Sequence, residues 1–233
     1  WIKGKSAFIL QSYNGNLDDV NTLAHELGHS IHTHLYARAQ PPSNCRISYC
    51  VAECASTFGE LLLTEKLLKS ASSVDEKRLV LGKVLDAFDI SVFLTATRFR
   101  LESNLYKAVA DGTYLDGEQI SKLWAEARQW MFADTVDWAP ETRWEWARVP
   151  HFFFADIRYY NYPYAFAQLF TFALYRLYKE EGREFVPRFK GLLAAGSSRS
   201  AEELASDFGF DLGEEAFWQK GMDQDREFLN RIE

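Results

Sequence analysis

A histidine pair with helical spacing is the feature that most constrains how this chain can fold. Residues 25–29 read His-Glu-Leu-Gly-His. On a helix, residues four apart point the same way about one turn apart, so His25 and His29 can hold one metal ion. Glu26 projects beside them, where it can accept a proton from a metal-activated water. The spacing therefore predicts a helix that carries a metal site for hydrolysis.

The flanking residues indicate where this helix begins and ends. Asn16 can cap a helix whose first turn holds two acids, which are favoured near the positive end of a helix dipole. The prolines at 41–42 follow shortly after Ala39, and proline stops a helix. We therefore expect a helix that starts with Asp18 and Asp19 and runs to about Ala39.

The two sides of this helix differ in character. One face is apolar and is expected to pack into the core: Val20, Leu23, Ala24, Leu27, Ile31 and Leu35. A separate stripe carries imidazoles and a phenol: His25, His29, His32 and Tyr36. We expect His34, on the apolar side, to be structural, and His32 to support the site rather than bind the ion.

The remaining sequence predicts a mainly α-helical fold with a small β element at the N-terminal end. Residues 7–13 read as a short strand that ends at an Asn-Gly-Asn turn signal. Helices are expected near 47–70, 73–112, 117–132, 161–182, 184–195, 200–208 and 214–230.

Composition excludes several classes of function. The formal charge of −7 argues against nucleic acid as a partner, and no apolar run approaches the length that spans a bilayer. The first residues do not resemble a secretory signal, so a cytoplasmic setting is expected. The cysteines at 45, 50 and 54 are expected to be free thiols, with a second metal site as the alternative.

A third metal ligand should come from a neighbouring element, because catalytic zinc sites usually take three protein ligands and leave a position for water. Glu53 is the lone acid in the otherwise apolar or small stretch 51–58. A buried carboxylate without a partner costs several kcal/mol, so a nearby cation would explain it. Glu60, two turns further along, is the alternative.

An aromatic cluster in residues 144–164 contains His151, the one histidine outside the first helix. Aromatics at this density usually pack, and packing is the expected role of Tyr159 and Tyr162. Hydrolysis of a carbonyl substrate at a metal also needs a hydrogen-bond donor for the tetrahedral oxyanion, however, and histidine or tyrosine can supply it. His151 is therefore a candidate for catalysis.

The motif and its spacing resemble the oligoendopeptidase F and thimet oligopeptidase family. The histidine motif is followed 24 residues later by Glu53 within Glu-x-x-Ser. The resemblance implies one zinc ion per chain on His25, His29 and Glu53, with Glu26 as the general base. Further matches, in part to the oligoendopeptidase F branch, are Gly28, His32, Tyr13-Asn14-Gly15 and Gln40-Pro41.

The aromatic cluster carries a second part of the resemblance. Family members have a Pro-His-Phe segment followed by Phe/Tyr-Tyr-x-x-x-Tyr, and His151, Tyr160 and Tyr164 occupy those positions. The resemblance implies that His151 and Tyr160 stabilise the transition state, while Tyr164 contacts substrate or the oxyanion. Thimet-type members have another tyrosine where this chain has Ala167.

The resemblance covers most of the chain but a minority of a typical member. Family members are more than twice as long, and a large helical region before the motif forms one wall of a deep channel. We expect residues 1–233 to form a helical zincin-type catalytic domain that corresponds to the C-terminal part of such a protein. The N-terminal helical region is then an expected partner, and the chain is either a fragment or a minimal homologue.

These expectations combine into a zinc-dependent endopeptidase that hydrolyses peptide bonds in oligopeptides. The segment 7–13 could pair with an extended substrate backbone. A zinc exopeptidase on a related helical fold is one alternative, although no sequence feature singles out a group for a free terminus. A catalytically impaired peptide-binding fragment is the other.

Overall fold

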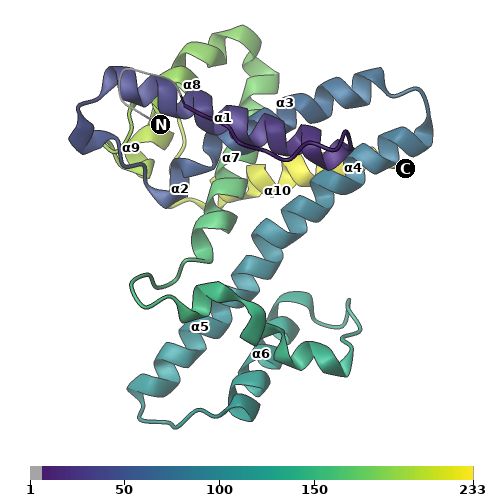
Figure 1. Cartoon of the computed structure of the whole chain (residues 1–233), viewed down its shortest axis with the longest axis vertical. Coiled ribbons are helices and arrows are strands. Elements are labelled where there is room, and N and C mark those ends of the chain that lie inside the picture. Colours follow the sequence, from purple (N-terminus) through teal and green to yellow (C-terminus); the bar gives the residue numbers. More distant parts are fainter. Residues whose placement is uncertain (1–6, 233) are drawn as a thin grey trace. The chain divides into compact units, whose positions relative to one another are not determined.

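The computed structural model describes residues 7–232, and the chain is mainly helical, as predicted (Figure 1). The α-helices are α1 Leu17–Ala39, α2 Tyr49–Ala52, α3 Cys54–Ser70, α4 Val74–Asp89, α5 Thr95–Ala110, α6 Gly117–Phe132, α7 Tyr162–Glu181, α8 Phe185–Ala194, α9 Ala201–Ser206 and α10 Glu215–Leu229. Short 3₁₀ helices are η1 Pro42–Asn44, η3 Pro140–Arg148, η4 Pro150–Phe153 and η5 Gly182–Glu184, and η2 Ile90–Leu94 is π-helical.

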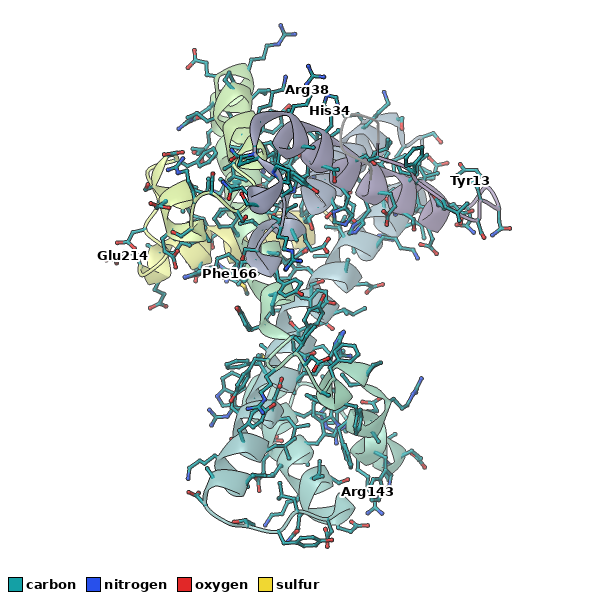
Figure 2. The ribbon with its side chains drawn as sticks, turned by 60° about the vertical axis from the view of Figure 1, so that its left-hand side comes forward. Tyr13, His34, Arg38, Arg143, Phe166 and Glu214 are labelled. Atoms are coloured by element: carbon teal, nitrogen blue, oxygen red, sulfur yellow. The ribbon has the colours of Figure 1, made fainter. Side chains whose placement is uncertain are left out.

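The predicted β element is wrong. Residues 7–14 form no strand, and none of the residues from 7 to 232 does. A strand needs a partner for its backbone hydrogen bonds, and this segment has none in the described part of the chain. Phe8 and Leu10 are strongly exposed, and Tyr13 is exposed on the surface near the start of α1 (Figure 2). The idea that a strand at 7–13 pairs with substrate therefore loses its basis.

The chain divides into two compact units. The first consists of Trp1–Phe88 and Phe166–Glu233, and the second of Asp89–Ala165. The histidine-rich helix α1 and its neighbours α3 and α8 belong to the first unit, and α5 and α6 to the second. No helix within residues 7–232 has both the length and the apolar character that a membrane crossing requires.

Helix α1 begins and ends where the sequence predicted. Asn16 is its N-cap, and its side chain accepts a hydrogen bond from the Asp19 backbone while the Asp19 carboxylate accepts one from the Asn16 backbone. This reciprocal capping satisfies two backbone donors that the helix itself cannot use. The helix then continues to Ala39, just before the two prolines.

The face of α1 that is buried differs from the predicted one. Its buried residues are Gly28, His32 and Tyr36. The expected core-facing side chains Leu27 and Ile31 are instead 47% and 54% exposed. The expectation that the apolar stripe packs into the core is therefore wrong.

Glycine at the helix crossing explains this orientation. A Cβ on Gly28 would lie 2.3 Å from the backbone oxygen of Ala55 in α3, and one on Gly59 would lie 2.8 Å from the backbone oxygen of Ala24. Only glycine permits so close an approach of two backbones. The crossing of α1 and α3, visible in Figure 1, thus determines which side of α1 faces inward.

The apolar stripe lines a groove rather than the core. Leu27, Ile31 and Leu35 form one wall of a hollow of about 400 Å³, with residues of α8 on the other side. His34 is exposed and lies with Arg38 on the outer surface of α1 (Figure 2). The structural role expected for His34 on a buried face is not found.

Two predicted long helices are interrupted. The helix expected at 47–70 breaks at Glu53, which ends α2 and precedes α3 with a ψ of 0°. The helix expected at 73–112 contains the π-helical segment η2 between α4 and α5. Such π-segments in helices are often found at functional sites.

Aromatic side chains dominate the core of the first unit. Phe58 of α3 contacts rings from α7 and α8, among them Tyr175 and Phe189 at centroid distances of 5.5 and 4.4 Å. The second unit has its own core, in which Leu101 of α5 packs with Trp124 and Ala127 of α6. The three cysteines are free thiols, as expected.

Candidate metal centre

Three side chains of the first unit converge at the crossing of α1 and α3. The Nε2 atoms of His25 and His29 lie 3.1 Å apart. The Oε2 atom of Glu53 lies 3.3 Å from each of them. Among the described residues, these three form the one group of histidine, cysteine and acidic side chains arranged to hold a metal ion.

The geometry and chemistry of this triangle suit zinc. Ligand atoms about 2.0–2.1 Å from a tetrahedral zinc ion lie about 3.3–3.4 Å from one another. The observed separations of 3.1–3.3 Å match this spacing closely. Two imidazoles and one carboxylate are also a common ligand set of catalytic zinc, which leaves a fourth position open.

The break before α3 positions the Glu53 carboxylate. Ser56, one turn later, donates from Oγ to Glu53 Oε2 at 2.7 Å. Burial alone would raise the pKa of Glu53, but hydrogen bonds from His29 and Ser56 and the charges of both histidines lower it to about 2. The carboxylate is therefore anionic at neutral pH, the state that binds a cation.

Glu60 contacts the ring nitrogen of His25 that is not part of the triangle. Its Oε1 lies 2.6 Å from His25 Nδ1. When Nδ1 donates to this carboxylate, the lone pair of Nε2 is free to face the triangle. Burial tends to lower the pKa of His25, but the hydrogen bond with Glu60 and the charges of Glu60, Glu53 and Glu26 outweigh it and raise that pKa.

The two acids that the sequence suggested for the third position lie differently around the histidines. Glu53 directs an oxygen at both histidines, whereas Glu60 contacts the opposite ring nitrogen of one of them. Glu60 thus occupies an orienting position behind His25 rather than a place in the triangle.

Glu26 and His32 lie on the same helix but outside the triangle. Glu26 is half-buried, and its charge helps to raise the pKa of His25. His32 is 2% exposed and hydrogen-bonds to the backbone of Ala52, the residue before Glu53. Burial, followed by the nearby His29, lowers the pKa of His32 to about 4. His32 therefore packs in the core and contributes to the contact between α1 and α2.

A cavity of about 340 Å³ adjoins the triangle within the first unit. His25 and Glu60 form part of its wall, and Asn21 and Thr22 of α1 contribute polar groups. Phe172 of α7 supplies apolar surface. The triangle therefore borders a space large enough to receive a side chain of a ligand.

In the second unit, the structure brings together the three aromatic residues singled out by the sequence. The ring of His151, in η4, lies 5.1 Å from that of Tyr160 and 5.8 Å from that of Tyr164. Phe154 closes the group at 5.5 Å from His151. The Nδ1 atom of His151 is buried and has no hydrogen-bond partner among the described residues.

The two neighbouring tyrosines pack, as expected. The ring of Tyr159 lies 5.4 Å from Phe99 and 5.0 Å from Tyr106. The ring centroid of Tyr162 lies 6.3 Å from that of Phe99. Ala167, which replaces the additional tyrosine of thimet-type proteins, is buried.

Sequence reasoning missed the contact between Glu60 and His25 Nδ1, although a signal was present. Glu53, Ser56 and Glu60 stand at spacings of three and four residues, which place their side chains on one side of a helix. The contact between His32 and the Ala52 backbone had no comparable signal, because it depends on how closely α1 approaches α2.

The fold and the triangle define a class: helical proteins with a His-Glu-x-x-His helix beside a carboxylate that directly precedes a neighbouring helix. Residues 3–224 match the model of peptidase family M3. The chain belongs to that family, and the resemblance seen in its motifs is confirmed.

Individual relatives agree with this assignment. Oligoendopeptidase F, plasmid, of Lactococcus lactis subsp. cremoris is 34% identical over 210 residues, which are 89% of this chain and 34% of that protein. Oligopeptidase PepF of Bacillus subtilis (strain 168) is 30% identical over 209 residues, 90% of this chain and 31% of that protein. The chain thus spans about a third of the length of the curated relatives it matches.

A solved structure shares the fold. The crystal structure of oligoendopeptidase-F from Enterococcus faecium superposes with a TM-score of 0.77 at 27% identity. The match covers 93% of this chain and 39% of that one.

Proposed function

We propose that this chain is the catalytic part of a zinc-dependent endopeptidase that hydrolyses peptide bonds in oligopeptides. The triangle of His25, His29 and Glu53, with ligand atoms 3.1–3.3 Å apart, is the observation that carries the proposal. The names of its relatives, an oligopeptidase and an oligoendopeptidase, support the choice of substrate.

The three side chains of the triangle would hold the ion. When bound there, zinc would supply a Lewis acid for a carbonyl oxygen and would lower the pKa of water enough for it to serve as a nucleophile near neutral pH. Glu60 keeps the His25 ring in the required tautomer through its contact with Nδ1 at 2.6 Å. Ser56 fixes the Glu53 oxygen that faces both imidazoles.

Glu26 is the general base in this proposal. It adjoins His25 in sequence on α1 and is half-buried rather than fully solvated. Its carboxylate removes a proton from the attacking water and passes it to the leaving amine. Because the same group serves as base and then as acid, one carboxylate suffices for both proton transfers.

His151 and Tyr160 supply hydrogen-bond donors to the oxyanion that forms on the scissile carbonyl, and Tyr164 contacts the substrate. The proximity of their rings within the second unit, 5.1–5.8 Å between centroids, supports a common role. Donors of this kind act most strongly where charge develops in the transition state.

Metal analysis combined with a peptide assay tests the proposal. The purified chain should contain about one zinc per molecule and should cleave internal bonds of a quenched peptide blocked at both ends. A chelator should stop cleavage, and added zinc should restore it. Cleavage that requires a free terminus would indicate an exopeptidase, and binding of the peptide without turnover would indicate a binding module.

A further inference from the structure

A buried carboxylate in α5 contacts the backbone just before Tyr160. Glu102 is 4% exposed. Its Oε1 accepts a hydrogen bond of 2.7 Å from the backbone N–H of Tyr159. The two residues are 57 positions apart in the sequence, so this bond ties the loop before α7 to the middle of α5. Both lie in the second unit.

The backbone at the donating end of this bond has an unusual conformation. Tyr159 has a φ of 56°, in the left-handed region that a bulky residue rarely adopts. Such a conformation persists only where surrounding contacts stabilise it, and it is common at functional sites. The φ of Tyr159 also sets the direction in which the chain continues, and the next residue is Tyr160.

Tyr160 lies in the turn that precedes α7. The carbonyl of Tyr159 accepts a hydrogen bond from the Tyr162 backbone, which opens α7. Tyr159 is thus held at both its backbone groups, by Glu102 on one side and by the start of α7 on the other. Tyr160 follows directly and lies between Tyr159 and Tyr162, the two residues joined by the second of these hydrogen bonds.

Side-chain packing supports the same conformation. The Tyr159 ring lies against Phe99 and Tyr106, one on each side of Glu102 in α5. Burial, together with the charge of Glu102, raises the pKa of the Tyr106 phenol. The Glu102 carboxylate is therefore close to the aromatic side chains that pack against the Tyr159 ring.

We infer that Glu102 is a positioning residue: it fixes the left-handed turn at Tyr159 and thereby aims the Tyr160 phenol for catalysis. The inference rests on the proposed function for its catalytic part, since it requires that Tyr160 acts on the transition state. Its structural part concerns the turn alone. Glu102 itself does not contact the substrate.

A pair of substitutions separates the acceptor from the bulk of the side chain. Glu102→Met removes the oxygens and nearly keeps the length, whereas Glu102→Gln keeps an oxygen that can accept from Tyr159. Glu102→Asp retains the charge but withdraws the acceptor, and it replaces Glu102→Met if that variant does not fold. Glu118→Met is the matched control, because Glu118 is an exposed carboxylate of the same unit that pairs with Arg143.

Two readouts are measured on the zinc-loaded chain. Hydrogen exchange should become about tenfold faster in the peptide that covers residues 155–165 of Glu102→Met, while peptides from α1 stay unchanged. In the same variant, kcat should fall about 10- to 100-fold with little change in KM, as expected for a misplaced catalytic group. Glu102→Gln and Glu118→Met should stay close to wild type in both readouts.

The outcomes are distinct. Wild-type exchange in Glu102→Met or Glu102→Asp would overturn the anchoring of the turn, and faster exchange with an unchanged kcat would overturn its link to catalysis. A fall in kcat equal in Glu102→Gln and Glu102→Met would also contradict the inference, because the first keeps the acceptor. If Tyr160→Phe itself leaves kcat unchanged, the proposed role of the phenol fails, and the exchange data still decide whether Glu102 holds the turn.

Discussion

Gly28 of α1 meets the backbone of Ala55 in α3 so closely that a Cβ on Gly28 would lie 2.3 Å from the Ala55 oxygen. Gly28 stands between the two histidines of the triangle, and Ala55 follows Glu53 by two residues. The separation of the two helices at this point therefore determines whether the carboxylate reaches both imidazoles.

Gly28→Ala should weaken zinc binding as well as stability. The added methyl group forces the helices apart, and overpacking of this kind typically costs about 1–3 kcal/mol. Zinc affinity, measured by competition with a chelator, should fall at least about tenfold, since ligands must be placed accurately. Gly82→Ala in α4 is the control, because a Cβ there meets nothing within 4 Å. Undiminished zinc affinity in Gly28→Ala would show that the crossing does not set the site.

The carboxylates Glu53 and Glu60 should differ in their effects on zinc. Glu53→Gln removes an anionic ligand, so zinc should be lost on routine dialysis. Glu60→Leu removes only the partner of His25 Nδ1, and loss of such partners typically costs about 10–100-fold in metal affinity. Zinc content after dialysis and a chelator titration measure both. Unchanged zinc in Glu53→Gln, with loss in Glu60→Leu, would exchange the two assignments.

The buried imidazole of His32 should make the metal-free chain less stable in acid. Its pKa is about 4 in the folded chain, against 6.5 for an ordinary histidine. Between these values the unfolded chain binds a proton that the folded chain refuses, so stability falls as the pH drops from 6.5 to 4. The shift corresponds to about 3 kcal/mol at most.

The other groups near His32 with shifted pKa values change the stability mainly outside the range from pH 4 to 6.5. The lowered pKa of Glu53, about 2, contributes stability that is lost below pH 4.5. The raised pKa of His25 contributes stability that is lost as the pH rises above 6.5. Urea unfolding of the metal-free chain at several pH values gives the free energy of unfolding. Between pH 4 and 6.5 this free energy should change less steeply with pH in His32→Gln than in the wild type. An identical slope in both proteins would refute the assignment.

Removal of either proposed oxyanion donor should lower kcat. A single such donor is commonly worth about 10²–10³ in kcat, so His151→Ala and Tyr160→Phe should each lose activity in that range. KM and zinc content should change little, because the donor is engaged mainly in the transition state. Tyr162→Phe is the control, since this ring packs on Phe99 and is 43% exposed. Full activity in Tyr160→Phe would return that phenol to a packing role.

Local signals in the sequence predicted much of the helical framework. The Asn16 cap and the prolines after Ala39 both correspond to observed helix boundaries. These signals succeed because each is satisfied by backbone groups within one turn. The three residues of the triangle were likewise found from spacing and from the isolation of one acid in an apolar stretch.

Non-local contacts explain the errors. The segment 7–13 has the composition of a strand, but no described strand supplies the hydrogen bonds it would need. Periodicity gave the wrong buried face of α1, because the close approach at Gly28 outweighs the preference of Leu27 and Ile31 for the core. The break at Glu53 and the bond from Glu102 to Tyr159 depend on neighbours distant in sequence, which periodicity does not reveal.

Turnover of a doubly blocked quenched peptide by Glu26→Gln, compared with wild type at equal zinc content, tests the central claim most directly. The substitution keeps the shape of the side chain and leaves the triangle intact but removes the base. Zinc should therefore stay bound while hydrolysis falls by more than the roughly 10²–10⁴-fold of a typical proton-transfer group. Near-normal turnover by Glu26→Gln would contradict the account.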